Sequence, residues 1–223
     1  MHKVHKVGRA KFCCFAIAYS FLTTVLFEND YFNFNPEPMD PFVLETPRLR
    51  LRPLELSDAP AIQKAAGARE IADTMISLPH PYPAGEAERY IIRQQSEREA
   101  GRSVTFVIEQ KSEGGFCGLI ELRDIDREHS QAELSFWLAV DVWGQGYMSE
   151  VIHAVVRYGF ASLGLNRLYA HHMLRNPASG RVLEKNGFKQ EGLLRQRVRK
   201  WGQFEDVSLW AILRKDWQET VNQ

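Results

Sequence analysis

A strand, a turn with two glycines and a helix follow one another without interruption in the middle of this chain. Residues 131–140, QAELSFWLAV, alternate apolar and polar side chains as a strand does, and residues 147–162 carry apolar side chains at helical spacing. Gly144 and Gly146 lie between them. Without a Cβ the backbone can come close to a ligand, and the amides and dipole at a helix N-terminus favour an anion. The stretch predicts either a phosphate-binding turn or merely a tight connection.

Two common phosphate motifs do not fit this turn. A P-loop has Lys followed by Ser or Thr after its glycines, whereas Tyr147 and Met148 stand at these positions. A dinucleotide fingerprint has a third small residue three positions beyond Gly146, and Ser149 would serve. However, that fingerprint belongs to a βαβ unit, while strands of antiparallel appearance precede this turn. Neither motif is therefore expected.

The remaining pattern predicts one α/β domain over residues 46–217. Ser57 and Asp58 are expected to cap its first helix, and Asn186 with Gly187 to end its last. Strands are expected at residues 48–54, 103–110, 115–125, 131–140, 167–174, 188–198 and 204–213. Helices are expected at residues 59–67, 84–100, 147–162 and from about 176 to 186.

Residues 1–45 differ in composition from the rest of the chain. A basic start is followed by a nearly apolar stretch, residues 12–27, and then by a linker. The apolar stretch is short for a membrane-spanning helix, which needs about 20 residues. Three alternatives remain: a signal peptide, a peripheral anchor with weak membrane association, or a segment ahead of a working start at Met39.

Charge and cysteine content exclude several classes of function. The chain has 28 Lys and Arg and 28 Asp and Glu, so direct binding to nucleic acid is not expected. Three cysteines without a C-x-x-C pair predict neither a disulfide framework nor a zinc site, and they favour a cytoplasmic location. His171 and His172 are adjacent on a predicted strand and should point to opposite faces, so no metal site is expected there.

The segments on either side of the turn resemble the GNAT N-acetyltransferase superfamily, in particular its branch of ribosomal-protein N-terminal acetyltransferases. Residues 143–147, WGQGY, followed by Glu150, match the acyl-CoA motif of that branch. RNPASGRVLEKNGF, with Asn176, Ser179 and Gly187-Phe188, matches its second motif. The resemblance covers residues 46–217. Asp141 stands where many members carry Arg or Gln, so only backbone contacts to phosphate are expected nearby.

The resemblance implies an α/β fold with a mixed, mostly antiparallel central sheet and helices on both faces. Two parallel strands, residues 131–140 and 167–174, would splay apart in a V and hold the pantetheine arm of acetyl-CoA. The pyrophosphate would lie on the amides of residues 144–149. Acetyl-CoA is the implied co-substrate, without a metal. The implied cofactor contacts are Leu138, Val140, Trp143, Gly144, Gln145, Gly146, Tyr147, Met148, Ser149 and Asn176.

The resemblance also suggests catalytic roles. Ser179 would give the departing thiolate a proton or a hydrogen bond, and Asn176 would fix that segment. The plainer alternative is that Asn176 caps a helix and Ser179 lies in its first turn. Glu133 is the candidate base, directly or through water. Its place beside Trp137 on a covered sheet face predicts a raised pKa, whereas the plainer alternative is a surface glutamate. The oxyanion would be bound by a backbone N–H of strand 131–140.

The expected reaction is transfer of acetyl from acetyl-CoA to an amine, by direct attack in a ternary complex. A protein N-terminal α-amine is a possible acceptor, because its pKa of about 7.7–8.0 is nearer neutrality than the 10.4 of lysine. The alternatives are a small-molecule amine, or an acyl-CoA sensor without turnover. Residues 75–83 and the basic turn at 195–203 are expected to line the acceptor groove. A monomer or homodimer is expected.

Overall fold

The computed structural model describes residues 43–112 and 114–221. The expectations for residues 12–27 and for a start at Met39 lie outside the described residues. Within the described part of the chain, no helix combines the length and apolar character needed to cross a membrane.

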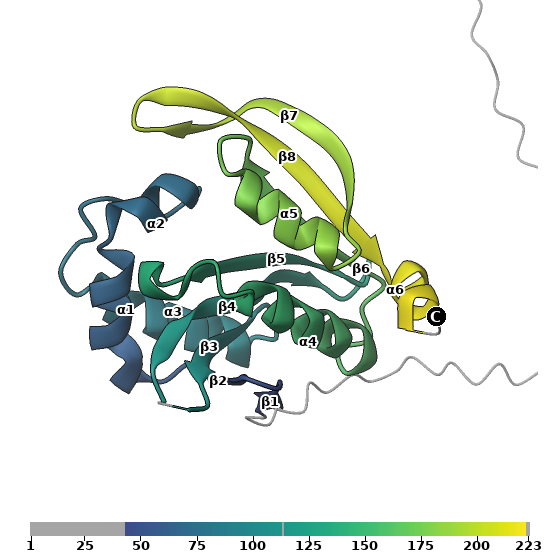
Figure 1. The fold of residues 1–223 in the computed structure, drawn as a ribbon, viewed down its shortest axis with the longest axis horizontal. Coiled ribbons are helices and arrows are strands. Elements are labelled where there is room, and N and C mark those ends of the chain that lie inside the picture. The colour runs from purple at the N-terminus through teal and green to yellow at the C-terminus, as the bar shows by residue number, and fades with distance from the viewer. Residues whose placement is uncertain (1–42, 113, 222–223) are drawn as a thin grey trace, which may run out of the picture. The chain divides into compact units, whose positions relative to one another are not determined.

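One eight-stranded sheet organises the described residues, in the order β1-β2-β3-β4-β5-β6-β8-β7 (Figure 1). All neighbouring strands are antiparallel except β5 and β6, which are parallel. The expected mixed and mostly antiparallel sheet is therefore confirmed. The strands are β1 (Leu44–Glu45), β2 (Leu49–Pro53), β3 (Val104–Gln110), β4 (Phe116–Asp126), β5 (Gln131–Leu138), β6 (Arg167–Met173), β7 (Lys189–Lys200) and β8 (Gln203–Leu213).

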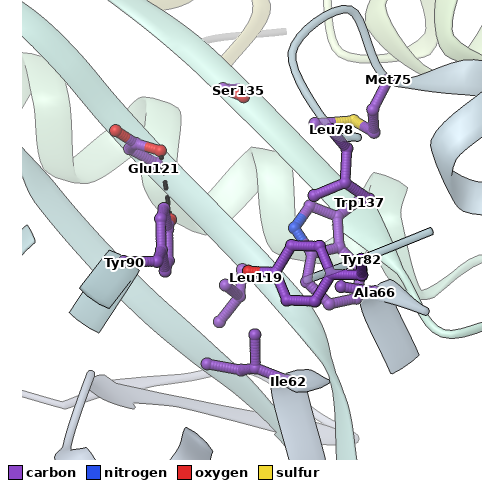
Figure 2. Close-up of a pocket in the computed structure, with 10 residues that line it drawn as sticks. All are labelled: Ile62, Ala66, Met75, Leu78, Tyr82, Tyr90, Leu119, Glu121, Ser135 and Trp137. Atoms are coloured by element: carbon purple, nitrogen blue, oxygen red, sulfur yellow. Dashed lines mark hydrogen bonds between the residues drawn. The ribbon is translucent and has the colours of Figure 1, made fainter. Parts of the chain in front are cut away.

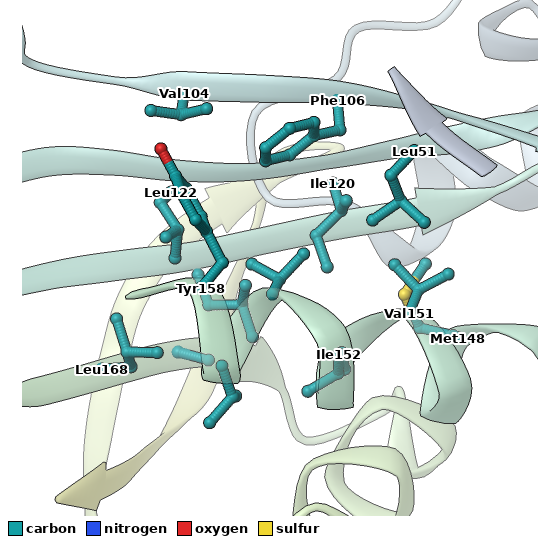
Figure 3. Close-up of a cluster of buried hydrophobic side chains, with 14 of the residues drawn as sticks. Leu51, Val104, Phe106, Ile120, Leu122, Met148, Val151, Ile152, Tyr158 and Leu168 are labelled. Carbon is teal, nitrogen blue, oxygen red and sulfur yellow. The ribbon is translucent and has the colours of Figure 1, made fainter. Parts of the chain in front are cut away.

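Helices cover both faces of this sheet, as expected. They are α1 (Ala59–Ala66), α2 (Arg69–Thr74), α3 (Glu86–Glu99), α4 (Tyr147–Ala161), α5 (Pro177–Lys185) and α6 (Arg214–Val221). Helices α1 and α3 pack on one face, where Ile62 lies near Leu119 of β4 (Figure 2). The next residue of β4, Ile120, points to the opposite face and packs against α4 (Figure 3).

The larger core lies under α4. Val151, Ile152 and Val155 are fully buried on one stripe of this helix, against Phe106 and Leu122 of the sheet (Figure 3). Each fully buried aliphatic side chain contributes about 1.5–3 kcal/mol to folding. This packing fixes the N-terminus of α4 relative to β5, from which the glycine turn leads into the helix.

Strands β5 and β6 separate after three pairs of residues. Their parallel register runs from Gln131 with Arg167 to Glu133 with Tyr169, although β5 continues to Leu138. Beyond this point β5 stays paired with β4 and β6 with β8, so each strand is held by its outer neighbour. The expected V-shaped splay is confirmed, and we call the opening the β5–β6 gap.

The structure contains elements that the sequence pattern did not predict. Strand β1 pairs Leu44 with Leu51, and the short helix α2 and terminal helix α6 were also missed. The predicted capping of the first helix by Ser57 and Asp58 was wrong. The helix has no side-chain cap, because the Asp58 carboxylate accepts the backbone N–H of Glu55 at 2.8 Å and pairs with Arg52 at 2.6 Å.

Candidate active site

The glycine turn has a backbone conformation that few residues other than glycine adopt. Gly144 has φ +75° and Gly146 has φ +77°. No atom lies within 4 Å of a Cβ placed on Gly144, and only the Arg48 guanidinium, at 3.7 Å, approaches one on Gly146. The turn therefore needs glycine for its own geometry, and the space beside it is open to a ligand.

The N-terminus of α4 lacks a side-chain cap. Gly146 is its N-cap residue and offers no side chain to the first amides of the helix. Such amides have no partner within the helix and carry the positive end of its dipole. The residues present thus fit the pyrophosphate of acetyl-CoA. Contact with residues 144–149 stays a prediction.

Arg48, the residue before β2, braces this turn from outside. Its guanidinium donates to the carbonyl of Gln145 at 2.9 Å, pairs with Glu150 at 2.7 Å, and lies 4.6 Å from the centre of the Tyr147 ring. Glu150 also accepts from the Thr46 hydroxyl at 2.6 Å. Burial raises the pKa of Glu150, but these hydrogen bonds outweigh burial and lower it. Sequence reasoning missed Arg48, which lies about a hundred residues away.

The other predicted cofactor residues surround the turn in different ways. The Trp143 indole donates to the carbonyl of Leu138 at 2.8 Å and ties the end of β5 to the turn. Val140 lies between them in a single 3-10 turn and is half-exposed. Tyr147 and Met148 have buried side chains, so any contact with cofactor would come from their backbone. Ser149 is partly exposed in the first turn of α4.

Asn176 and Ser179 are bonded to each other at the start of α5. The Asn176 side-chain amide donates to the Ser179 hydroxyl at 2.9 Å, and its carbonyl accepts the Ser179 backbone N–H at 3.4 Å. Asn176 is therefore a helix cap, as the plainer alternative held. It also orients the Ser179 hydroxyl. Because the hydroxyl oxygen accepts from Asn176, its own proton is free to be donated elsewhere.

Glu133 contacts Arg123 and His171, at the end of the β5–β6 gap where the two strands are still paired. It pairs with Arg123 at 2.9 Å, and its Oε1 lies 3.0 Å from Nδ1 of His171. Burial raises its pKa, but the hydrogen bonds from His171 and Arg123 and the Arg123 charge outweigh burial, so the pKa is lowered. The predicted raised pKa was wrong, because the pattern on one strand did not reveal Arg123 and His171 beside it.

The two adjacent histidines have separate surroundings. His171 contacts Glu133, whereas His172 packs against Trp210 and under Gly180 of α5, whose Cβ would lie 2.9 Å from the imidazole Nε2. Because Nδ1 of His171 faces a carboxylate, we assign the proton to Nδ1 and the lone pair of the neutral ring to Nε2. Among residues 43–112 and 114–221, no three side chains are grouped as metal ligands.

A cavity lies on the opposite face of the sheet from α4. Its volume is about 60 Å³. The residues that line it are Ile62, Ala66, Met75, Leu78, Tyr82, Tyr90, Leu119, Glu121, Ser135 and Trp137 (Figure 2). Burial raises the pKa of Glu121 more than the charge of Arg123 lowers it. The carboxylate with a raised pKa is thus on β4, where sequence reasoning did not place it.

The tip of the β7–β8 hairpin contacts α2 and the segment that follows this helix (Figure 1). Lys200 donates to the carbonyl of Leu78 at 2.5 Å, and the Trp201 indole donates to Asp73 at 2.7 Å. Burial lowers the pKa of Lys200. Met75 and Leu78 line the cavity, whereas no residue of 195–203 is among its lining residues. That turn holds the 75–83 segment in place.

Comparison with known proteins assigns the family. Residues 48–189 match the model of the acetyltransferase (GNAT) domain. The chain is 32% identical over 172 residues to the uncharacterized N-acetyltransferase YoaA of Bacillus subtilis (strain 168), which covers 77% of this chain and 97% of that protein. It is 30% identical over 113 residues to the ribosomal-protein-serine acetyltransferase of Escherichia coli (strain K12), over 51% of this chain and 62% of that protein.

A solved structure agrees in fold and carries the coenzyme. The spermidine N-acetyltransferase from Vibrio cholerae, in complex with CoA and spermine, has a TM-score of 0.69 and 27% sequence identity. The alignment covers 76% of this chain and 98% of that chain. With the β5–β6 gap and the uncapped glycine turn, these similarities lead to one conclusion. This chain belongs to the GNAT acetyltransferase family and is an N-acetyltransferase that uses acetyl-CoA.

Proposed function

We propose that this enzyme transfers the acetyl group of acetyl-CoA to a protein N-terminal α-amine, by direct attack in a ternary complex. The observation that carries the proposal is the β5–β6 gap, which has the glycine turn and α4 on one face of the sheet and the cavity on the other. A thioester lying in the gap would be open to an amine from the cavity side. An α-amine needs less deprotonation at neutral pH than a lysine or alkyl amine.

Proton removal from the amine is assigned to His171, with Glu133 as its positioning residue. His171 lies two residues beyond Tyr169 on β6 and Ser135 two residues beyond Glu133 on β5, so both belong to the stretch where the two strands are no longer paired. Nε2 of His171 would accept the proton, and the Glu133 carboxylate would stabilise the resulting imidazolium, as a carboxylate does for a catalytic histidine elsewhere. The lowered pKa of Glu133 suits this role better than that of a direct base, because the carboxylate stays charged.

Departure of the thiolate is assigned to Ser179. As the amine nitrogen bonds to the acetyl carbon, negative charge develops on the carbonyl oxygen and a backbone N–H of β5 would stabilise it. When the C–S bond breaks, the Ser179 hydroxyl would donate to the sulfur. Its bond from Asn176, at 2.9 Å, supports this orientation.

A direct assay tests the proposal. Purified full-length protein is incubated with acetyl-CoA and either a peptide or a small amine, and free CoA and the acetylated product are both measured. We expect CoA release to require an amine and to match product one to one. Tight binding of acetyl-CoA without release by any amine would contradict the proposal and identify a sensor.

A further inference from the structure

The cavity has a polar side and an apolar side. In Figure 2, Glu121, Tyr90 and Ser135 lie to one side, and the larger apolar side chains, such as Trp137 and Leu78, lie to the other. Glu121 is the single carboxylate among the ten lining residues, and Lys and Arg are absent from them. A ligand that fits this lining has one cationic or donor group and an apolar remainder.

The polar side of the cavity adjoins the β5–β6 gap. Glu121 of β4 is paired with Ser135 of β5, and Ser135 lies beyond Glu133, where pairing with β6 has ended. Residues directly opposite on antiparallel strands have Cβ atoms about 4.5–5.5 Å apart. The Glu121 carboxylate therefore lies next to the stretch of β5 along which the thioester is expected.

Glu121 is buried without an ion pair to any described residue, although the charge of Arg123 acts on it. Its relative exposure is 9%, and its hydrogen-bond donors are Tyr90 at 3.4 Å and Gln94, both from α3. No ion pair of Glu121 occurs among the described residues. A buried carboxylate without an ion pair is unfavourable, so a bound ammonium or amine N–H would stabilise it. Glu133, in contrast, already has Arg123 and His171 beside it.

We propose that the cavity is the acceptor subsite, and that it takes a primary amine bearing one short apolar substituent, with Glu121 accepting a hydrogen bond from the nitrogen. This inference rests on the proposed function and names its acceptor class. A volume of about 60 Å³ corresponds to roughly four to six water positions, room for a short aliphatic group. The amine then meets the acetyl carbon beside Ser135.

The same lining disfavours a polyamine. A second ammonium group on the acceptor would lie against Trp137, Leu78 or Met75, where no second carboxylate lines the cavity. Leaving a charge against apolar surface is unfavourable. Both the α-amine of a peptide that begins with a short aliphatic residue and a short alkyl amine have one amine and a short apolar substituent. A comparison of peptides with small amines separates these two kinds of acceptor.

The test compares acceptors by their kcat/KM with full-length enzyme and saturating acetyl-CoA. The peptides are identical except for a first residue of Ala, Val, Asp or Trp, and the small amines are isobutylamine and spermidine. We expect Ala and Val peptides to exceed Asp and Trp peptides by at least about tenfold, and spermidine to be poorer than isobutylamine. A ratio of Val peptide to isobutylamine well above one assigns the peptide source.

Failure of the acceptor class and failure of the proposed function would give different results. Efficient acetylation of spermidine, or equal rates for Val and Asp peptides, would overturn the acceptor class while leaving the acetyltransferase function intact. Absence of acetylation for every amine would overturn the proposed function and this inference together.

Variants of the cavity give a second test. Glu121→Gln should raise KM for the amine about ten- to a hundredfold, the scale of one hydrogen bond to a charged group, with KM for acetyl-CoA unchanged. Tyr90→Phe is the matched control, because it removes a donor to Glu121 but keeps the carboxylate. An unchanged amine KM in folded Glu121→Gln would overturn the subsite.

A further variant does not depend on the buried glutamate. Leu78→Ala, on the partly exposed segment over the cavity, should enlarge the apolar side and raise the Trp-to-Ala peptide preference about tenfold. An unchanged preference would contradict the assignment of this cavity to the acceptor.

Discussion

The two sides of the β5–β6 gap differ in whether their charged side chains are already paired within the protein. On the α4 side, Arg48 and Glu150 beside the glycine turn are paired with each other. On the cavity side, Glu121 is buried and has only neutral donors. The difference teaches that the proposed cofactor side offers a ligand only the uncapped amides of α4, whereas the proposed acceptor side offers it a buried carboxylate.

The pKa values of Glu133 and Glu121 are shifted in opposite directions. Both are largely buried on the same sheet face, on adjacent strands. Hydrogen bonds and charge from Arg123 and His171 outweigh burial at Glu133 and lower its pKa, while burial prevails at Glu121 and raises its pKa. Burial alone therefore does not decide the charge state of an active-site carboxylate.

The largest effect is expected for substitutions that disrupt the His171–Glu133 pair. His171→Gln should lower kcat about 10²–10⁴-fold, the usual range for loss of a general base, without changing KM for acetyl-CoA. Glu133→Gln should lower kcat as well, and the double variant should be no slower than His171→Gln alone, because the two act as one unit. Steady-state kinetics with thermal melting as a fold control measures this. Additive losses would contradict the pairing.

The next largest effect is expected for a substitution at the proposed pyrophosphate site, which tests the cofactor side alone. Gly146→Asp places a carboxylate at the expected pyrophosphate site, and like charges at an interface cost several kcal/mol, so acetyl-CoA binding should weaken about a hundredfold or more. Gly146→Asn is the matched control, since Asn is similar in shape, tolerates positive φ and adds no charge. Calorimetry should separate the two variants. Equal affinities would move the pyrophosphate elsewhere.

A smaller effect is expected at Ser179. Ser179→Ala should lower kcat about ten- to a hundredfold with KM for acetyl-CoA nearly unchanged, because one hydrogen bond to the departing thiolate is lost. Ser179→Thr keeps the hydroxyl and should retain most of the activity. Full kcat in the alanine variant would reduce Ser179 to a residue of the capped first turn.

The smallest effect compares the two glutamates in the absence of substrate. Because the pKa of Glu133 is lowered, its stabilisation is present above the unfolded value of about 4.3 and is lost as pH falls through the folded pKa. Glu121, with a raised pKa, favours the folded state most below about pH 4.3 and loses that contribution as pH rises through its folded pKa.

Glutamine variants should therefore shift Tm in opposite directions. At pH 7 Glu133→Gln should lower Tm and Glu121→Gln should raise it, each by a few degrees, since about 1 kcal/mol corresponds to 2–4 °C in a domain of this size. Both differences should shrink near pH 4. Shifts of the same sign at pH 7 would contradict the comparison.

The sequence predicted the parts of the site that are local in the chain. The glycine turn and the Asn176–Ser179 pair each lie within one short segment, whereas the splay of β5 and β6 was implied by the family resemblance. Arg48 precedes β2, and Glu121 and His171 lie on β4 and β6, so their neighbours depend on how distant segments come together in the sheet. The register of β4 and β5 also explains why the pKa shift of Glu133 was predicted in the wrong direction. Arg123 is paired with Glu133, and a shift of one residue would turn the Arg123 side chain to the other face of the sheet.

The affinity of a single molecule that joins CoA to the acceptor tests the central claim most directly. In this conjugate the sulfur of CoA is linked through an acetyl bridge to the α-amine of a Val peptide. If the gap connects a cofactor side to the cavity, both halves bind at once, and calorimetry should give a Kd at least about a hundredfold below that of CoA. The conjugate should also compete with both substrates. A Kd equal to that of CoA, with competition against acetyl-CoA alone, would contradict the account.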